Sequence, residues 1–597
     1  MIRYQIHPLR PEAHLFEITL TVPEPTPEGQ SLSLPAWIPG SYMIRDFARH
    51  IVTIVAHQGE QELTIAKLDK QTWQLPPVSG PVTVRYQVYA WDLSVRGAHL
   101  DTTHGYFNGA CVFLAAMGFE DQPCEVVIEP PAGGAHGTWK LATGLPRVSG
   151  AELDFGVFQA SDYDALIDHP VEMGPFDHAQ FIARGVPHRV VLSGRHRADM
   201  NRLGRDLKTI CEHHIDLFGE PAPMTDYLFM TLVTDGYGGL EHRNSTSLMS
   251  PRTDLPLLTD APNKVRDGYR SYLGLCSHEY FHTWNIKRIK PAAFTPFDLR
   301  EEVHTELLWA FEGITSYYDD LALARTGLIT PESYLELLGQ TLTRVQRGQG
   351  RFRQTVTESS FDAWTRFYKQ DENAANAIVS YYAKGALVAL ALDLTLRERS
   401  GETVTLDHLM RLLWRRYGNG NEGVPERGIQ ALAEELLGAD LDDFFGPALY
   451  STDDLPLTDL LARRGVVLNW RAAAGHGDNG GKPAKAPAPV HLGVRVVADT
   501  LGARIQVAYE QGAAMAAGLA AGDVIIAVDG LKTDAAGLDH LLGAYQEGER
   551  VEVHAFRRDE LMRFTVTLAP SAPDTAWLAL AEGGLTDLGR AWLLGQV

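Results

Sequence analysis

The stretch His278-Glu279-Tyr280-Phe281-His282 has the spacing of a catalytic zinc site. On a helix, residues four positions apart lie on one face, so the two imidazoles can hold one metal ion. Glu279 lies between them and can reach a water on that ion as general base. Zinc suits this chemistry because three protein ligands leave a fourth position open for water, whose pKa the ion lowers. The stretch therefore predicts a helix that carries two zinc ligands and one catalytic carboxylate.

Composition and charge argue against several classes of partner. The 597 residues are enough for roughly three to four domains. The balance of 75 acidic against 53 basic residues gives a net charge of −22, which disfavours nucleic acid and anionic membranes as main partners. No run of about 18 apolar residues occurs, so we expect no membrane span. The start of the chain lacks the pattern of a signal peptide and the four cysteines are scattered, so we expect a cytoplasmic protein.

Five segments follow from the patterns along the chain, and together they predict a multidomain α+β protein. Residues 1–185 are rich in strand patterns, for which we expect an N-terminal antiparallel β domain. Residues 186–470 indicate a thermolysin-like α/β plus helical catalytic domain. Residues 472–489 form a Gly/Pro/Ala linker, residues 490–570 a small β domain, and residues 571–597 a C-terminal tail with no assigned task.

Helical periodicity is clearest in the central segment, after a short strand pattern at 228–233. It predicts helices around 264–285, 303–326, 331–347, 375–399 and 405–417.

Three motifs carry a resemblance to a known family: the early segment 37–47, His278-Glu279-x-x-His282-x-Trp284-Asn285, and Trp309-x-x-Glu312-Gly313-x-x-x-Tyr317-Tyr318. Together they resemble the glycyl aminopeptidase family, PDZ-containing gluzincin zinc metallopeptidases related to aminopeptidase N. The resemblance extends over about residues 1–570 and implies one zinc ion per chain and aminopeptidase activity, with a preference for small N-terminal residues, glycine or alanine.

Two glutamates compete for the place of the third zinc ligand. Glu301 follows His282 after 18 residues, the interval of aminopeptidase N-like enzymes, but it belongs to an acidic cluster typical of a solvated helix N-terminus. Glu312 is a lone carboxylate among aromatic and aliphatic residues, where burial without a partner is costly. Spacing favours Glu301 and local context favours Glu312, and we expect Glu312 to be the ligand.

The segment 236–244 resembles the edge strand of aminopeptidase N-like enzymes. By that resemblance Gly238 and Gly239 line the substrate, and Glu241 binds its free α-amine, which limits cleavage to the first residue. His242 stands where those enzymes have asparagine.

Tyr382 lies in Tyr381-Tyr382-Ala383-Lys384-Gly385, which resembles the segment whose tyrosine stabilises the oxyanion in related enzymes. A donor of that kind lowers the barrier by around 3 kcal/mol.

Residues 513–530 resemble the core of a bacterial PDZ domain. The loop Leu492-Gly493-Val494 corresponds to its carboxylate-binding loop, whose backbone amides can receive a peptide C-terminus. Peptide C-termini are therefore expected partners of this domain.

Three functions are compatible with these residues. The first is a zinc aminopeptidase acting on peptides with a free N-terminus. The second is a zinc endopeptidase with PDZ-guided substrate capture, if Glu241 does not act as an anchor. The third is a non-catalytic PDZ-bearing binding or scaffold protein, which the intact His-Glu-His set argues against.

Overall fold

The protein is described by a computed structural model, which covers residues 1–597 apart from 133–136, 262–263, 484–485 and 596–597. The described residues form two compact units. Unit 1 contains Met1–Val303 and Leu413–Val424, and unit 2 contains His304–Leu412 and Pro425–Val597. No helix among the described residues combines the length and the apolar character that a membrane crossing needs.

Unit 1 begins with a β domain built on an eight-stranded sheet in the order β14-β15-β12-β1-β2-β8-β4-β5. Side chains alternate along its strands, so Ile2, Tyr4 and Ile6 of β1 enter one core. The predicted antiparallel sheet is confirmed, with one parallel pair between β1 and β12. The strands are β1 (Ile2–Arg10), β2 (Leu15–Val22), β4 (Ile51–Gln58), β5 (Gln61–Leu63), β8 (Val82–Tyr89), β12 (Cys124–Ile128), β14 (Arg147–Ser149) and β15 (Gly156–Ala160).

Two four-stranded sheets complete this β domain. Their orders are β13-β16-β10-β9 and β11-β3-β7-β6. The strands are β3 (Ser31–Ser33), β6 (Ala66–Lys67), β7 (Thr72–Gln74), β9 (Ala98–Leu100), β10 (Gly105–Phe107), β11 (Ala115–Ala116), β13 (Lys140–Thr143) and β16 (Val171–Gly174).

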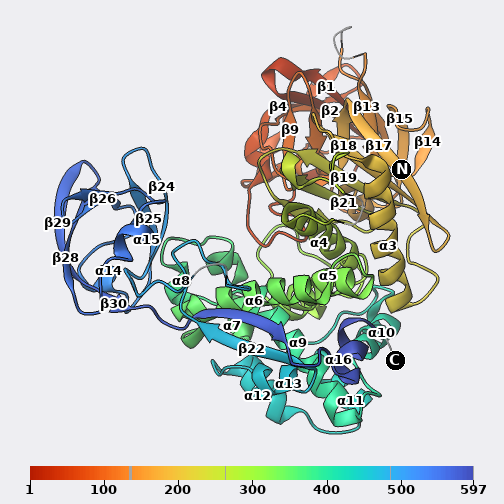
Figure 1. Ribbon diagram of the computed structural model, residues 1–597. Coiled ribbons are helices and arrows are strands. Elements are labelled where there is room, and N and C mark those ends of the chain that lie inside the picture. The colour runs from red at the N-terminus through yellow and green to blue at the C-terminus, as the bar shows by residue number, and fades with distance from the viewer. Residues whose placement is uncertain (133–136, 262–263, 484–485, 596–597) are drawn as a thin grey trace. The chain divides into compact units, whose positions relative to one another are not determined.

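A five-stranded mixed sheet in the order β17-β18-β19-β21-β20 follows in unit 1. Its central strands β18, β19 and β21 run parallel, and β20 pairs antiparallel to β21 at one edge. Helices α3 (Met200–Phe218) and α4 (Asp267–Phe281) pack on each other and on this sheet (Figure 1). The strands are β17 (Phe176–Ala183), β18 (Val186–Ser193), β19 (Tyr227–Val233), β20 (Gly238–Glu241) and β21 (Ser245–Ser250).

Unit 2 is helical around α9 (Ala383–Ser400), whose side chains from Ala383 to Arg397 are all buried. A helix that is buried on every side lies at the centre of its neighbours rather than on a surface. The surrounding helices are the π-helical turn η6 (Trp309–Gly313), α5 (Ile314–Arg325), α6 (Pro331–Arg347), α7 (Val356–Phe361), α8 (Ala374–Ala377), α10 (Leu406–Tyr417, shared with unit 1), α11 (Gly428–Leu437), α12 (Asp442–Tyr450) and α13 (Leu457–Ala462).

The PDZ-like domain is inserted between two strands that pair with each other. Strand β22 (Val466–Arg471) leaves the helical part of unit 2, and β31 (Thr575–Leu580) returns antiparallel to it. The tail then ends in α16 (Asp587–Leu593), which packs on α5. Trp592 of α16 is fully buried and donates its indole N–H to the Tyr317 hydroxyl at 2.9 Å. The tail is therefore part of the helical core, a role that its sequence did not indicate.

The inserted domain has a sheet in the order β24-β25-β26-β28-β29 with the short helix α15 (Leu538–Leu542). Strand β24 stands at the edge of this sheet. The strands are β24 (Val494–Ala498), β25 (Ala503–Ala508), β26 (Val524–Val528), β28 (Arg550–Arg557) and β29 (Glu560–Thr567).

Candidate metal and substrate site

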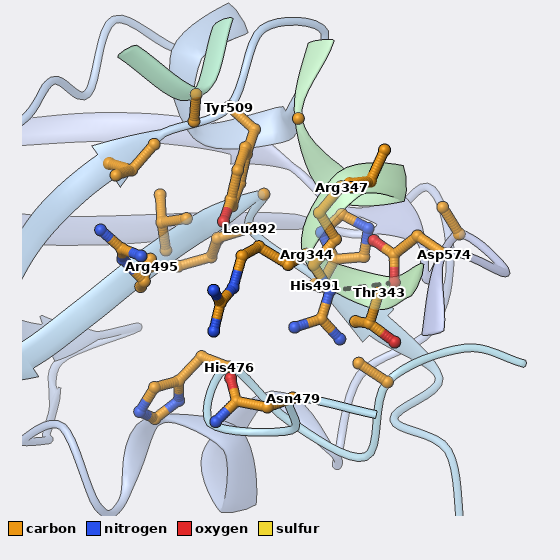
Figure 2. A pocket seen from close by; sticks show the side chains of 18 of the residues that line it. Thr343, Arg344, Arg347, His476, Asn479, His491, Leu492, Arg495, Tyr509 and Asp574 are labelled. Atoms are coloured by element: carbon orange, nitrogen blue, oxygen red, sulfur yellow. Dashed lines mark hydrogen bonds and ion pairs between the residues drawn. The ribbon is translucent and has the colours of Figure 1, made fainter. Parts of the chain in front are cut away.

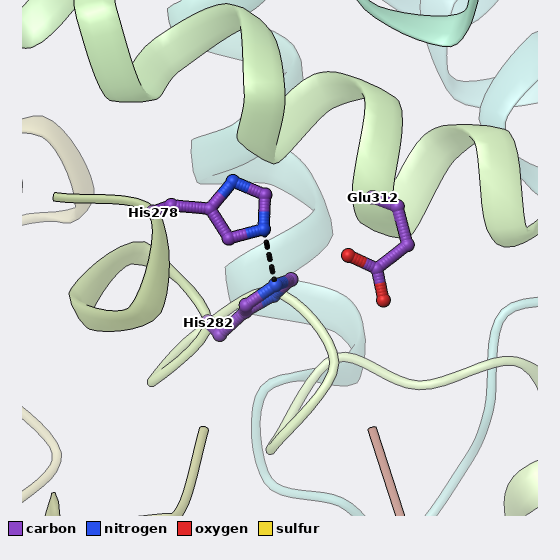
Figure 3. A group of neighbouring side chains, drawn as sticks. All are labelled: His278, His282 and Glu312. Carbon is purple, nitrogen blue, oxygen red and sulfur yellow. Dashed lines mark hydrogen bonds between the residues drawn. The ribbon is translucent and has the colours of Figure 1, made fainter. Parts of the chain in front are cut away.

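The end of α4 turns two imidazoles toward each other. His278 lies in the last turn of α4 and His282 caps the helix. Their Nε2 atoms are 3.1 Å apart (Figure 3). The Nδ1 of His282 is 2.8 Å from the backbone oxygen of Asn285. Because a carbonyl oxygen only accepts, Nδ1 carries the proton and Nε2 keeps its lone pair for a metal.

The turn after α4 depends on Trp284. This side chain is fully buried and stacks on Phe218 of α3, with ring centroids 4.8 Å apart and planes 4° from parallel. The stacking fixes the chain where it leaves the helix, which places the Asn285 oxygen under His282. The Trp-Asn pair of the motif therefore orients a candidate ligand.

Glu312 joins the two histidines in one group of candidate ligands. One potential ligand atom from each of His278, His282 and Glu312 lies within 4.8 Å of the others, and the carboxylate faces the imidazoles (Figure 3). Glu312 is 2% exposed and belongs to the π-helical turn η6, a form that often occurs at functional sites. Glu301, the alternative, is exposed and is not part of this group.

The donor set fits zinc. Two imidazoles and one carboxylate form one of the common three-ligand sets of catalytic zinc. Two nitrogens bound at about 2 Å to one tetrahedral ion lie roughly 3.3 Å apart. The separation of 3.1 Å between the two Nε2 atoms is close to that value.

Two glycines bring the Glu312 turn close to the segment that carries Tyr382. A Cβ atom on Gly313 would lie 2.6 Å from the Cα of Gly385, so neither position accommodates a side chain. The contact draws η6 against the start of α9, directly after Tyr382. Burial, and after it the Glu312 carboxylate, raise the pKa of Tyr382 well above its ordinary value. Tyr382 therefore stays a neutral hydrogen-bond donor at neutral pH.

The hydroxyl of Tyr382 has a neighbour that the sequence did not single out. Tyr368 places its own hydroxyl 3.4 Å away, and Phe367 stacks on the Tyr382 ring at 5.5 Å. Tyr381, the adjacent tyrosine, is fully buried. No local spacing rule links residues 368 and 382, so only the fold reveals this pair.

Strand β20 lies directly beside the candidate general base. A Cβ atom on Gly239 would overlap the carboxylate of Glu279, which is 4% exposed. Gly238, with a φ of +146°, has open space around it. Two consecutive positions without side chains thus leave an edge strand that a peptide backbone can approach.

Glu241 ends the same strand and is buried at 4% exposure. Gly40, from the early motif 37–47, lies against its carboxylate with a φ of +91°, and a Cβ atom there would overlap it. Within the described residues, Oε1 of Glu241 has no hydrogen-bond partner. A buried carboxylate oxygen of this kind is suited to a cation supplied by a ligand.

His242 does not turn toward that oxygen but is held by a buried charge cluster. Its Nδ1 lies 3.1 Å from Oδ1 of Asp168, which also pairs with the Lys287 ammonium at 2.7 Å. Burial works to raise the pKa of Asp168, but Lys287 and the His242 hydrogen bond outweigh it and hold that pKa well below its ordinary value. Burial in turn lowers the pKa of His242. The sequence assigned no role to Asp168, which lies 74 residues before His242.

The PDZ loop presents backbone donors. The carbonyl oxygens of Leu492 and Gly493 accept from Ala514 and Tyr509 at 2.7 and 2.9 Å. Their own N–H groups donate to no acceptor in the part of the chain that the structure describes. Gly493 has a φ of +71°, which glycine adopts without strain, and Val494 begins the edge strand β24.

Comparisons with known proteins agree with this arrangement. The M61 glycyl aminopeptidase family matches residues 271–388, its N-terminal domain matches residues 3–175, and the PDZ domain matches residues 490–568. A solved aminopeptidase N family protein from Idiomarina loihiensis is 45% identical, with a TM-score of 0.96 over 99% of this chain and 100% of that chain.

More distant similarity adds little. An M1 zinc metallopeptidase from Deinococcus radiodurans is 15% identical, with a TM-score of 0.48 over 76% of this chain and 94% of that one. That likeness is too distant to carry a conclusion about function. No curated protein matches the chain. The matches along the chain and the close solved relative lead to one conclusion: this protein is a metallopeptidase that belongs to the M61 glycyl aminopeptidase family.

Proposed function

We propose that the protein is a zinc aminopeptidase that removes the first residue from peptides with a free N-terminus. The observation that carries the proposal is the course of β20, which passes Glu279 at Gly239 and ends at Glu241. Two residues of extended strand span about 7 Å, the scale of a single substrate residue. A substrate whose α-amine pairs with Glu241 therefore has only its first carbonyl near Glu279.

One zinc ion per chain, held by His278, His282 and Glu312, is the cofactor in this proposal. When bound, it lowers the pKa of a water molecule and polarises the scissile carbonyl. The donor set, the separation of the imidazole nitrogens and the proton on Nδ1 of His282 support this assignment.

The chain's own residues supply the remaining steps. Glu279 accepts a proton from the attacking water and passes it to the leaving amine. Tyr382 donates a hydrogen bond to the carbonyl oxygen as that oxygen gains negative charge, and its raised pKa keeps the proton available. Glu241 pairs with the α-amine, which excludes peptides whose N-terminus is blocked.

The preference for glycine or alanine is part of the proposal and rests on the family. The matched family is described as a glycyl aminopeptidase. A set of aminoacyl anilides that differ only in the first side chain measures this preference directly, and we expect kcat/KM to fall from glycyl and alanyl to leucyl and phenylalanyl substrates.

The decisive experiment compares a free glycyl anilide with its N-acetylated form, before and after chelation of the metal. We expect hydrolysis of the free substrate, loss of activity with the chelator, recovery with added zinc, and almost no turnover of the acetylated form. Equal hydrolysis of both substrates would make the protein an endopeptidase. Bound zinc without hydrolysis across a broad panel would make it a binding protein.

A further inference from the structure

Unit 2 contains a cavity of about 620 Å³ that lies outside the catalytic residues (Figure 2). Its walls come from the PDZ loop, from α6 of the helical part, and from the segments around residues 370–380 and 473–479. The PDZ domain therefore supplies only part of the site. The rest belongs to the peptidase framework.

The position of the PDZ domain beside these walls is fixed by Asn376. Its side chain is 2% exposed, donates to the Ala508 oxygen at 3.0 Å and accepts from the Glu510 N–H at 2.9 Å. An amide that satisfies two backbone groups at once holds the two parts in one register. The cavity is accordingly a built feature of unit 2.

The PDZ side of the cavity combines free backbone donors with an apolar floor. The N–H groups of Leu492 and Gly493 have no acceptor in the described chain, and the side chains of Leu492, Leu538 and Leu542 line the wall beside them. Edge strand β24 starts at the same place. These are the elements that hold an extended peptide ending in a carboxylate and an apolar residue.

The rest of the lining carries several charged side chains. Arg344 of α6 and Arg495 of β24 extend into it (Figure 2). Both are exposed, and neither forms an ion pair within the described residues. Arg347 also lines it, where it pairs with Asp574 at 3.3 Å and donates to Thr575 at 2.6 Å.

Arginines outnumber aspartates in the lining, four to three. Asp574 is paired with Arg347, and Oδ2 of Asp539 lies 2.7 Å from Nδ1 of His476. Asp371 stands exposed and accepts from the Asn373 N–H at 3.0 Å, a contact that leaves its negative charge in place. The lining therefore keeps an excess of positive charge, to which Arg344 and Arg495 contribute, on a chain with a net charge of −22.

We propose that this cavity binds the carboxyl-terminal end of an acidic peptide. The terminal carboxylate accepts hydrogen bonds from the N–H groups of Leu492 and Gly493, and the last side chain of the peptide, which is apolar, packs on Leu538 and Leu542. Acidic side chains upstream pair with Arg344 and Arg495 while the peptide backbone extends β24. The proposal does not depend on the catalytic chemistry.

The test measures binding of synthetic hexapeptides to the full-length protein by fluorescence anisotropy. Each peptide carries fluorescein on its N-terminus, which removes the α-amine and so keeps it from acting as an aminopeptidase substrate. One peptide has two glutamates upstream of a free C-terminal leucine, a second has lysines in their place, and a third is the acidic peptide with an amidated C-terminus. We expect the acidic free acid to bind at least about tenfold more tightly than the others, and less tightly as salt is raised.

Charge-reversal variants locate the site. Arg344→Glu and Arg495→Glu should each weaken binding of the acidic peptide by about tenfold or more, with partial recovery of affinity for the lysine peptide. Arg205→Glu, a reversal at an exposed position on α3 in unit 1, should change affinity less than about twofold. Hydrolysis of a glycyl anilide by all three variants verifies folding, and circular dichroism does so if the protein proves inactive.

Three results would overturn the proposal. One is equal affinity for the acidic and lysine peptides, which describes a PDZ site without charge selection. Another is undiminished binding of the amidated peptide, and the last is an effect of Arg205→Glu as large as that of Arg344→Glu. A protein that binds the peptide without hydrolysing anilides would leave this inference standing and remove the proposed function.

Discussion

At the scale of single residues, two carboxylates beside one short strand are set apart by their neighbours. Glu279 lies against the bare backbone of Gly239, and Glu241 lies against Gly40, where its Oε1 has no partner in the described chain. Glu279 follows the candidate metal ligand His278 directly in the sequence, whereas the buried Glu241 carboxylate has an oxygen that a ligand cation could pair with. The different tasks proposed for them thus follow from what surrounds each carboxylate, since the side chains are chemically the same.

Replacement of Gly239 by alanine tests this arrangement. The new methyl group would overlap the Glu279 carboxylate and displace it, so we expect kcat to fall by roughly 100-fold while the protein remains folded. Gly446→Ala in α12 is the matched control, because a Cβ atom there meets nothing within 4 Å. Steady-state kinetics with a glycyl anilide and a thermal melt are the measurements, and unchanged kcat in Gly239→Ala would contradict the placement of Glu279.

The two adjacent tyrosines allow a second test with an internal control. Tyr382→Phe removes the proposed oxyanion donor and should lower kcat by about 100- to 1,000-fold with little change in KM. Tyr381→Phe, at the fully buried neighbouring position, should retain most of the activity. Equal losses of kcat in Tyr382→Phe and Tyr381→Phe would contradict this assignment.

The pH dependence of the wild-type enzyme gives a related test. Because the pKa of Tyr382 is raised well above 10, wild-type activity should show no loss from its ionisation up to about pH 10.

At the scale of elements, local patterns predicted helices well where a helix buries one continuous face. The pattern at 331–347 coincides with α6, which has Thr330 as N-cap and Pro331 at its first position. The pattern at 303–326 fails over residues 303–307, because Glu426 accepts from the Thr305 hydroxyl at 2.8 Å and the Glu306 N–H at 3.0 Å and keeps this segment out of the helix. A partner 120 residues away leaves no trace in local periodicity.

Contacts between residues distant in sequence leave no local pattern, and this also limits what could be predicted of the site. His278 and His282 follow from helical spacing, and Glu312 from the cost of burying a lone carboxylate. Asp168 and Tyr368 do not follow from any pattern, because their partners are distant in sequence or lie outside a regular helix. The predicted helix at 375–399 is likewise interrupted between α8, which ends at Ala377, and α9, which begins at Ala383, since the Val379 N–H donates to the side chain of Gln354 instead.

The cluster of Asp168, His242 and Lys287 joins three segments of unit 1 that are distant in sequence, and its removal should destabilise the unit. Asp168→Ala leaves the buried Lys287 and His242 without their partner, which should cost about 3 kcal/mol. The pKa of Asp168 is lowered in the folded state, so its contribution is complete above the unfolded value of about 4 and is lost as pH falls through the lower folded value. The difference in melting temperature from wild type should therefore be constant near neutrality and shrink at acid pH.

Asp216→Ala is the control for this series. Asp216 is paired with Arg184 on the surface of unit 1, where both side chains are largely exposed, so its loss should cost less than about 1 kcal/mol. If the melting temperatures of the two variants fall equally, the Asp168 cluster does not stabilise the unit.

At the scale of the whole molecule, the chain enters and leaves the PDZ domain at one point. Arg471 of β22 and Thr575 of β31 are direct partners in the sheet, so the domain is inserted between two paired antiparallel strands. The hairpin and α16 complete the helical core, with Arg325 donating to the Trp592 oxygen at 3.2 Å. A domain attached in this way is removable only if both strands remain.

Two deletions test this topology against each other. Replacing residues 472–574 by a two-residue Asn-Gly turn closes β22 onto β31, so the variant should fold, hydrolyse a glycyl anilide and fail to bind the acidic peptide.

Ending the chain at residue 489 removes the PDZ domain together with β31 and α16, and with them the contact between the buried Trp592 and Tyr317. We expect that shorter chain to be insoluble or to melt well below wild type, because β22 loses its partner strand and the core loses a large aromatic side chain. Soluble expression, melting temperature and anilide hydrolysis are compared for both. A stable, active chain ending at 489 would show that the tail does not belong to the folded core, and an unfolded turn variant would show that the PDZ domain is more than an insertion.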